Sequence, residues 1–279
     1  MTQAAEQDTA QDNWRVWDRA EDYGQTLARR ATGDLPEMEC AKAVALRVKD
    51  LIRPGDHILD AGCGAGHYLR SLRRELDVPF SYTGVDATEG YVELARQAWE
   101  DTPDVRFEQG DLYSLPFDDR SFDLVICCNV FLHLPSVQVP LRELVRVSRR
   151  HTVVRTLVGE RSFRIMEVFT PETHGELFEG SAAADEFLPS GEPRNFAYYN
   201  IFAQSWFDKL LDRMPDVAGR SFTPDEQFDE KCLAQDAARD DAPGNTTQLI
   251  GRWQVNGGCI LLPWHLIQVD KTSEGASSA

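Results

Sequence analysis

Residues 60–69 read DAGCGAGHYL, and this stretch decides the fold. Gly62, Gly64 and Gly66 stand at alternate positions, after a short apolar run and before a segment with helical periodicity. Glycine permits positive φ and lets a ligand lie against the main chain. In open α/β sheets, ligands bind where a strand ends and its helix begins. The stretch therefore predicts the first strand–loop–helix unit of a parallel sheet, with a binding site at the loop.

The spacing of the glycines does not match the dinucleotide fingerprint. That fingerprint has the form G-x-G-x-x-G, whereas here His67 occupies the final position and Gly66 comes one residue earlier. The pattern is D-x-G-x-G-x-G, and its first residue is Asp60. The ligand therefore has to be inferred from the residues downstream.

Three further strand ends carry polar residues. Asp86 ends the second strand, where a carboxylate can accept two hydrogen bonds from a ribose diol. Asp111 and Leu112 follow the third strand and suit the amine and the flat ring of an adenine, and Asn129 closes the fourth strand. Together these residues predict a nucleoside site, although helix capping and turn formation remain alternative roles for the two aspartates.

Short apolar strands alternate with helical segments on both sides of this loop. The alternation predicts an α/β fold with a doubly wound, Rossmann-like sheet. We expect seven strands, mostly parallel, with a late antiparallel strand. The stretch VICCNVF at 125–131 has no polar face, as expected for a strand covered by helices on both sides. Pro263 lies inside the last apolar stretch, which we therefore expect to be an edge or bulged strand.

The domain organisation follows from the same pattern. An N-terminal helical segment precedes the nucleoside-binding core, a variable insert follows the fifth strand, and a C-terminal helix with strands completes the sheet. The expected boundaries are 1–12 for a disordered tail, 13–54 for the N-terminal helical segment, 55–159 for the core, 160–204 for a substrate-cap insert, 205–270 for the C-terminal part, and 271–279 for a second tail.

The core resembles the class I S-adenosylmethionine-dependent methyltransferases, and within them the branch that methylates small molecules, including the ubiquinone-biosynthesis C-methyltransferases. The resemblance rests on ILDAGCGAGHYLRSL, YTGVDATEGYVELAR, VRFEQGDLYSLPFDDRSFDLVICCNVFLHLP and LRELVRVSRR. These stretches span about residues 55–160, a little over a third of the chain. The resemblance implies that S-adenosylmethionine (SAM) is the cofactor.

The resemblance also implies roles for particular residues. The methionine moiety would be held at the glycine loop, the ribose at the second strand end, the adenine at the third and the sulfonium end at the fourth. The N-terminal helical segment at 13–54 would fold over the cofactor as a lid. The implied cofactor-binding residues are Asp60, Gly62, Cys63, Gly64, Gly66, Asp86, Ala87, Asp111, Leu112, Asn129, His133 and Tyr23. His133 is also the candidate catalytic base, with core packing as the alternative, and Met38 and Glu39 are further lid candidates.

Aromatic residues gather in the loosely patterned region after residue 160. His174, Tyr198, Tyr199 and Trp206 are the candidate substrate-binding residues of this cap. A hydrophobic underside that merely packs against the core is the alternative. In related enzymes the insert after the fifth strand sets specificity, and this favours the substrate role.

Charge and cysteine content exclude several classes. The net charge of −17 opposes binding to phosphate backbones and to anionic membranes. The six cysteines form no CxxC pair and match no zinc motif, so we expect reduced thiols, no metal and a cytoplasmic protein. The start of the sequence is polar and acidic, so we do not expect it to be a signal peptide. Monomer and homodimer both remain open.

The expected function is methyl transfer from SAM to a small-molecule acceptor. An in-line attack on the sulfonium methyl needs mainly positioning and exclusion of water. This explains why the sequence indicates a cofactor site but no obvious catalytic residue. The alternatives are a SAM-binding protein without methyl transfer, a methyltransferase that acts on protein or RNA, and a thiol-dependent arsenite methyltransferase.

Overall fold

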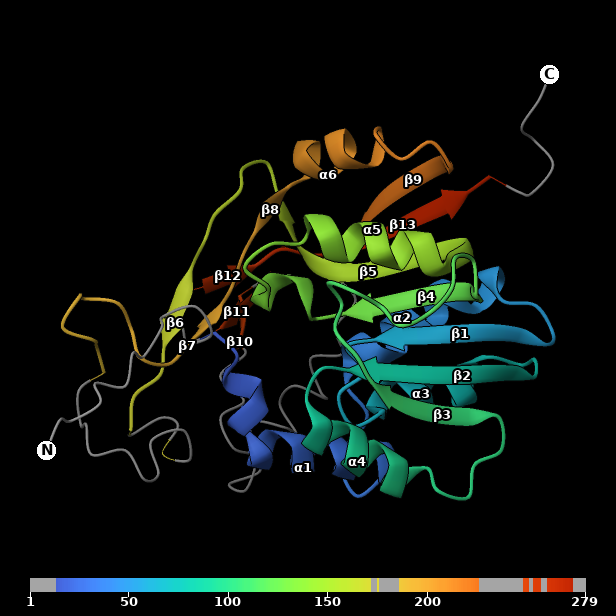
Figure 1. Cartoon of the computed structure of the whole chain (residues 1–279), viewed down its shortest axis with the longest axis horizontal. Helices are drawn as coiled ribbons and strands as arrows, with labels where there is room; N and C mark the ends of the chain where they lie inside the picture. Colours follow the sequence, from blue (N-terminus) through green and yellow to red (C-terminus); the bar gives the residue numbers. More distant parts are fainter. Residues whose placement is uncertain are drawn as a thin grey trace, which may run out of the picture.

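The computed structural model describes residues 14–171, 175, 186–225, 248–250, 253–256 and 260–272. The expected tail at 1–12, nearly all of the one at 271–279, and His174 lie outside these residues. The core is a twisted sheet in the order β3-β2-β1-β4-β5-β13-β9, with the short strand β8 paired to β5 (Figure 1). The strands are β1 (Asp56–Ala61), β2 (Phe80–Asp86), β3 (Val105–Gln109), β4 (Phe122–Cys128), β5 (Ser148–Gly159), β8 (Phe202–Ala203), β9 (Val217–Pro224) and β13 (Trp264–Lys271).

The parallel part and the late antiparallel strand are confirmed. β1 to β5 pair in parallel, and β13 runs antiparallel to both β5 and β9. The strand order reverses between β1 and β4, which is the switch point where doubly wound sheets bind ligands. The sheet has eight strands, one more than expected, because the two-residue strand β8 is too short to show a periodic pattern.

Helices cover both faces of the sheet. Ile58 of β1 packs in one cluster with side chains of α2, α3 and α4, whereas its neighbour Leu59 packs in a second cluster with α5 and α6. Successive strand residues point to opposite faces, so this split explains why the central strands are apolar throughout. The helices are α2 (Glu39–Val48), α3 (His67–Glu75), α4 (Glu89–Ala98), α5 (Gln138–Val147) and α6 (Gln204–Leu211).

The N-terminal part is helical, as expected, but its first segment is broken. A short 3-10 turn, η1 (Val16–Arg19), precedes α1 (Glu21–Thr32), and Ala20 between them has non-helical dihedrals. The Tyr91 hydroxyl donates to the Ala20 carbonyl over 2.9 Å. Residues 14–19 are called the strap below. Figure 1 shows the strap and α1 beside the arrowheads of β1, β2 and β4.

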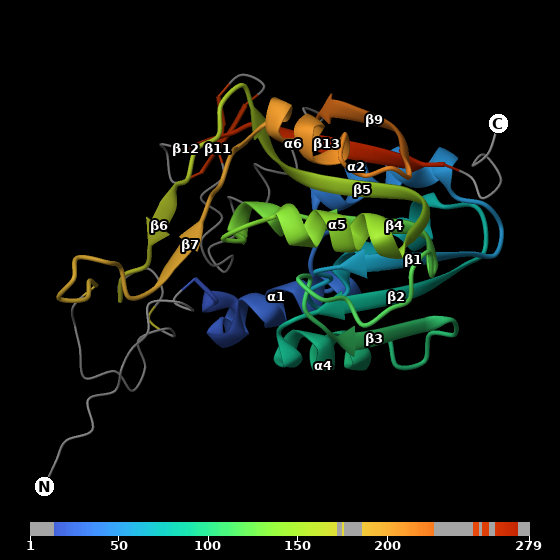
Figure 2. The same ribbon diagram turned by 45° about the horizontal axis from the view of Figure 1, so that its top comes forward.

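The last apolar stretch was expected to be an edge or bulged strand, and the edge alternative is wrong, whereas the pairing of β13 with β9 does shift register between Asp270 and Lys271. Pro263 lies between β12 (Ile260–Leu262) and β13, which belong to different sheets, and β13 sits between β5 and β9. A proline lacks the N–H that a central strand needs, and a junction between strands tolerates this. Figure 2 shows β11 (Trp253–Asn256) and β12 above the ribbon of β6 (Met166–Val168) and β7 (Phe196–Tyr198). The remaining strand of the small sheet is β10 (Gln248–Ile250).

Over the described ranges, no helix combines the length and apolar character required to cross a bilayer. Four cysteines in those ranges are buried free thiols: Cys40, Cys63, Cys127 and Cys128. No group of three or more His, Cys, Asp or Glu residues among the described positions could hold a metal ion.

Candidate functional site

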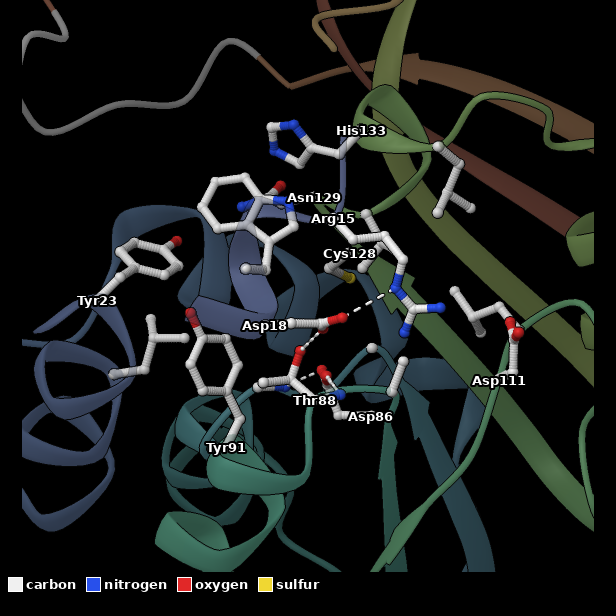
Figure 3. Close-up of a pocket in the computed structure, with 18 of the residues that line it drawn as sticks. Arg15, Asp18, Tyr23, Asp86, Thr88, Tyr91, Asp111, Cys128, Asn129 and His133 are labelled. Atoms are coloured by element: carbon white, nitrogen blue, oxygen red, sulfur yellow. Dashed lines mark hydrogen bonds and ion pairs between the residues drawn. The ribbon is translucent and has the colours of Figure 1, made fainter. Parts of the chain in front are cut away.

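A largely apolar cavity of about 1120 Å³, including its open mouth, lies at the carboxyl ends of β1, β2 and β4 and under the strap. This is where the sheet topology places a ligand. Figure 3 shows residues of the strap, α1, the β2–α4 turn and the segment after β4 around it. The lining residues are Trp14, Arg15, Trp17, Asp18, Tyr23, Leu27, Met38, Gly62, Gly64, His67, Tyr68, Asp86, Ala87, Thr88, Tyr91, Gly110, Asp111, Leu112, Tyr113, Cys128, Asn129, Val130, His133 and Leu134.

The glycine loop has the backbone that its sequence predicts. Gly62, Gly64 and Gly66 all have positive φ, at +80°, +53° and +76°. A Cβ atom on Gly62 would lie 2.4 Å from a methyl of Val130, so a side chain there would collide with the segment after β4. Gly62 and Gly64 line the cavity, whereas Gly66 packs against the ring of Phe107. The first two glycines thus expose the backbone to a ligand.

Asp86 ties the loop to the β2–α4 turn. Its Oδ2 accepts the Gly64 N–H over 2.8 Å, and its Oδ1 accepts the Thr88 N–H over 3.0 Å. Burial raises the pKa of this carboxyl, and the nearby Asp18 carboxylate raises it further. Each carboxylate oxygen has a second lone pair, so both can still accept a bond from a diol. The neighbouring Ala87 also lines the cavity.

Asp60 lies under the loop and outside the cavity lining. It is 1% exposed, and its Oδ2 accepts the Tyr82 hydroxyl over 2.7 Å. Burial raises the pKa of Asp60 to about 7. Cys63 is fully buried and also absent from the lining. The structure therefore does not bring these two predicted residues, or Gly66, to the cavity; they support the loop from below.

Asp111 and Leu112 lie together at the rim of the cavity. One oxygen of Asp111 accepts the Tyr113 N–H over 2.9 Å, and the carboxylate is exposed enough to bind a further donor. Leu112 is 8% exposed and lines the cavity beside it. An acid next to an apolar wall is the arrangement predicted for an adenine.

The strap supplies cavity residues that the sequence did not single out. Asp18 accepts the Thr88 hydroxyl over 2.9 Å, and Arg15 donates to Asp18 over 2.9 Å. These bonds fasten the strap over the Asp86 end of the cavity (Figure 3). Thr88 precedes α4 and makes no side-chain capping bond, and its hydroxyl donates to Asp18. Tryptophan and tyrosine at helical intervals predict a helix that packs against the core. The local sequence therefore does not indicate that the strap closes over the cavity.

Aromatic rings form the wall away from the glycine loop. The ring of Trp17 lies 5.3 Å from Tyr23 and 4.9 Å from His133, between ring centroids. Tyr23, predicted from the lid, lines the cavity, as does Met38. Glu39 binds Lys42 instead and is not part of the lining. This wall could hold a flat apolar molecule by stacking and edge contacts.

His133 lies at the other end of the cavity from Asp86 (Figure 3). Its Nδ1 is 2.7 Å from the carbonyl oxygen of Tyr198. A carbonyl only accepts, so Nδ1 carries the proton and Nε2 keeps a lone pair. Burial lowers the pKa of His133 to about 4, so the ring is neutral near pH 7. Its fixed tautomer makes it a hydrogen-bond acceptor.

His67 and Asn129 complete the end near the glycines. The Nδ1 atom of His67 is buried, with no hydrogen-bond partner in the structure, and burial lowers the pKa of this ring to about 3. Asn129 follows β4 with a positive φ of 62° and lines the cavity. An unpartnered buried nitrogen next to an exposed glycine backbone suits the polar end of a ligand.

The predicted substrate residues separate into two groups. Tyr198 and Tyr199 adjoin His133, the first through its carbonyl and the second with its ring 5.4 Å from the imidazole. Trp206, in α6, packs against Phe202 and Phe207 in the core and does not reach the cavity. Leu210 follows it by four residues, and this helical spacing indicates core packing, which explains the misplacement.

The cavity fits SAM by its chemistry. Asp86 can accept a ribose diol, Asp111 and Leu112 can receive an adenine, and the loop with His67 can meet the amino-acid end. The chain therefore offers donors, acceptors and apolar walls in the order in which SAM carries its parts.

Comparison with known proteins agrees with this geometry. Residues 58–151 match a family model described as a methyltransferase domain. The chain is 33% identical over 131 residues to an uncharacterized 37.1 kDa protein of transposon TN4556 from Streptomyces fradiae, covering 47% of this chain and 37% of that protein. It is 25% identical over 178 residues to a demethylmenaquinone methyltransferase of Staphylococcus haemolyticus, covering 60% of this chain and 74% of that enzyme.

Solved structures support the fold. Magnesium protoporphyrin IX methyltransferase from Synechocystis PCC 6803 with bound SAM aligns with a TM-score of 0.53 at 16% identity, over 95% of this chain and 99% of that one. The [4+2]-cyclase SpnF aligns with a TM-score of 0.57 at 16% identity, over 93% and 95%. At such identities the likeness concerns the fold alone.

Proposed function

We propose that this chain, whose residues 58–151 belong to the class I SAM-dependent methyltransferases, transfers a methyl group to a small apolar acceptor. SAM is the cofactor of this domain. The observation that carries the acceptor proposal is the aromatic wall of Trp17, Tyr23 and His133, which shares one cavity with the expected cofactor residues. Both reactants could therefore meet in a single apolar space.

The proposed mechanism relies on position. SAM, when bound, supplies a methyl group on a positively charged sulfur. Gly62, Gly64 and Asp86 would hold it from the sheet side, while the strap excludes water from above. Holding two reactants in line inside a closed apolar site supplies much of the rate enhancement that such a transfer needs.

His133 would orient an acceptor that carries a proton. Its Nε2 lone pair can accept a hydrogen bond from a hydroxyl or amine, because Nδ1 is bound to Tyr198. With its pKa lowered to about 4, the ring is a weak base but stays neutral throughout the physiological range. It could receive the proton of the attacking group as the new bond forms.

Several features favour a small molecule over a macromolecule. The net charge of −17 opposes RNA, and the strap narrows access to the cavity. The quinone methyltransferase among the relatives and the porphyrin methyltransferase among the solved structures act on small molecules by name. We propose a cytoplasmic protein that binds neither nucleic acid nor membrane, as a monomer or homodimer.

A SAM-binding protein without methyl transfer is the second candidate. The specific observation in its favour is the fold shared with a [4+2]-cyclase, so this architecture also occurs in a protein named for other chemistry. The two candidates differ in one product, because only a methyltransferase forms S-adenosylhomocysteine (SAH).

The first experiment is calorimetric titration with SAM and SAH, followed by SAH release with a panel of phenols, amines and carboxylic acids. We expect micromolar binding of both nucleosides and turnover with at least one acceptor. The variant His133→Asn keeps a donor for Tyr198 but lacks Nε2, and it should lower kcat/KM about 100-fold without weakening SAH. Trp206→Phe, in the core, is the matched control.

Two results would redirect this proposal. Binding of SAM without SAH release from any acceptor would favour the non-methylating alternative. Unchanged kcat/KM in His133→Asn would remove the orienting role from this histidine and leave the cofactor assignment intact.

A further inference from the structure

Arg155 is the largest side chain among the fully buried described residues, and the proposed function does not use it. It lies in β5 and is 1% exposed. Burying a guanidinium away from water carries a desolvation free energy of roughly several kcal/mol, which pairing and hydrogen bonding have to offset. A neutral apolar side chain would fill a strand position of this kind more cheaply, so the charge itself calls for an explanation.

Asp225, which follows β9, and Trp264 of β13 hold the guanidinium. Its Nε donates to Oδ2 of Asp225 over 2.6 Å, and its carbon lies 3.9 Å from the centroid of the Trp264 ring. Asp225 is itself 6% exposed, and its N–H donates to the Trp264 carbonyl over 2.9 Å. Stacking and a charge-assisted bond therefore fix the guanidinium plane from two sides.

The remaining edge of the guanidinium points at the cavity wall. Nη1 of Arg155 donates to Oδ1 of Asn129, and the Arg155 carbonyl accepts the Asn129 N–H over 3.0 Å. Asn129 has a φ of +62°, a conformation that asparagine tolerates better than most residues. Arg155 thus holds Asn129 through both its backbone and its side chain.

This contact decides which way the Asn129 amide faces. The oxygen and nitrogen of an asparagine side chain are usually assigned from their partners. A guanidinium has only donors, so the atom that it meets must be the oxygen. Nδ2 lies on the other side, 3.6 Å from Sγ of Cys40. Its second hydrogen is left for the cavity that Asn129 lines.

We propose that Arg155 and Asp225 form a positioning pair that holds the Asn129 amide with an N–H toward the cavity, where it binds an oxygen of the ligand. This inference rests on the proposed function. The ligand chemistry is a carboxylate or carbonyl oxygen. Two sources carry such an oxygen, the methionine carboxylate of the cofactor and an oxygen on the methyl acceptor. The glycine loop beside Asn129 favours the first source.

The test compares SAH with 5′-methylthioadenosine, which lacks the amino-acid end. Asn129→Asp keeps an acceptor for Arg155 and a side chain that tolerates positive φ, but it loses the donor. We expect unfolding stability at least equal to that of the wild-type protein, SAH affinity about 20-fold lower, and methylthioadenosine affinity within about twofold.

Arg155→Lys tests the positioning pair itself. A lysine keeps the charge but lacks the planar fork that reaches Asp225 and Asn129 together. We expect about tenfold weaker SAH binding, again with methylthioadenosine unchanged. Lys271→Met is the matched control, because Lys271 is a buried cation on the same sheet whose Nζ binds the Val145 carbonyl over 2.8 Å, outside the cavity. It should lose stability and keep SAH affinity.

The second source is tested with benzoate, titrated into SAH-saturated protein. If Asn129→Asp keeps SAH affinity but loses the benzoate binding of the wild-type protein, the oxygen belongs to the acceptor and the positioning pair stands. The proposal is overturned if both variants bind SAH, methylthioadenosine and benzoate as the wild type does. It is also overturned if both nucleosides weaken together in step with lost stability. Failure of the wild-type protein to bind either nucleoside would instead overturn the proposed function.

Discussion

The floor and the cover of the cavity are built in different ways. The floor consists of the glycine loop, Asp86 and Asp111, which lie within a few residues of strand ends. The cover consists of the strap and of His133 with its partners, joined by contacts between distant parts of the chain. Asp18 and Thr88 are 70 residues apart, and His133 and Tyr198 are 65 apart. The floor is therefore set by topology, and the cover by packing.

The largest expected effect concerns the floor. Asp86→Ala removes the acceptor for two backbone N–H groups, those of Gly64 and Thr88, as well as the expected ribose acceptor. Each bond to a charged group contributes about 1.5–3 kcal/mol, so SAH affinity should fall at least about 100-fold by calorimetry.

Asp111→Ala is the matched variant at the next strand end. Its carboxylate is exposed and holds one backbone N–H, so we expect a loss of only about tenfold. Equal losses in the two variants would mean that Asp86 does not organise the floor beyond its own contact with the ligand.

This contrast explains what the sequence predicts and what it does not. The sequence predicted that Gly62, Gly64 and Asp86 lie at the cavity. It could do so because the ends of parallel strands lie at one edge of the sheet, whatever surrounds them. Asp60 belongs to the same motif, yet its side chain turns into the core toward Tyr82, because neighbouring strand residues face opposite sides. A motif gives positions along a strand, while the direction of each side chain depends on the pleat.

The cover was predicted only in outline. The sequence placed Tyr23 in a lid but gave no reason for Asp18 to meet Thr88, since that contact depends on how η1 bends at Ala20. For Trp206 the error is the opposite one, because the sequence predicted a substrate residue and the structure places the side chain in the core. A high density of aromatic residues alone does not distinguish a pocket wall from a helix face that packs inward. Arg155 was missed because a single arginine in an apolar strand gives no indication of its partners.

The next prediction concerns the titration of the cover. The pKa of His133 is lowered from 6.5 to about 4 by burial, so the unfolded chain binds more protons between these values. This contribution to stability is complete above about pH 6.5 and is lost as the pH falls toward 4. For a half-buried ring we expect a loss of about 2 kcal/mol.

His133→Asn keeps the bond to Tyr198 but does not titrate in this range. Urea unfolding between pH 4.5 and 7.5 should therefore show a shallower pH dependence in the variant than in the wild type, by about that amount. Parallel curves for the two proteins would mean that the ring reaches solvent and that the cover is open.

A smaller effect is expected at the strap. Asp18→Ala removes the bond to Thr88 and the pairing with Arg15, so the strap should open more readily. We expect SAH to dissociate about fivefold faster in stopped-flow measurements. Asp22→Ala, an exposed acid on α1, is the control. Slower SAH dissociation from Asp18→Ala would mean that two effects of Asp18 have the opposite balance. Its charge, acting through Asp86, would then weaken SAH binding by more than the strap strengthens it.

The smallest effect on binding is expected at Asp60, the part of the motif that lies beneath the floor. Asp60→Asn preserves an acceptor for the Tyr82 hydroxyl, and Asp60 does not line the cavity, so SAH affinity should stay within about twofold. A loss of tenfold or more would place this carboxylate in the cofactor site after all.

Titration of Asp60 should change the stability of the protein with pH in the opposite direction to titration of His133. The folded pKa of Asp60 is raised from 3.8 to about 7 by burial, so the folded protein binds the extra proton between these values. Its contribution is complete below about pH 3.8 and is lost as the pH rises through 7. Asp60→Asn removes that loss, so the variant should gain on the wild type between pH 5 and 8 in urea unfolding. The stability contributed by Asp60, beneath the floor, is thus lost as the pH rises, and that contributed by His133, in the cover, is lost as the pH falls. A difference curve for each variant separates the two contributions.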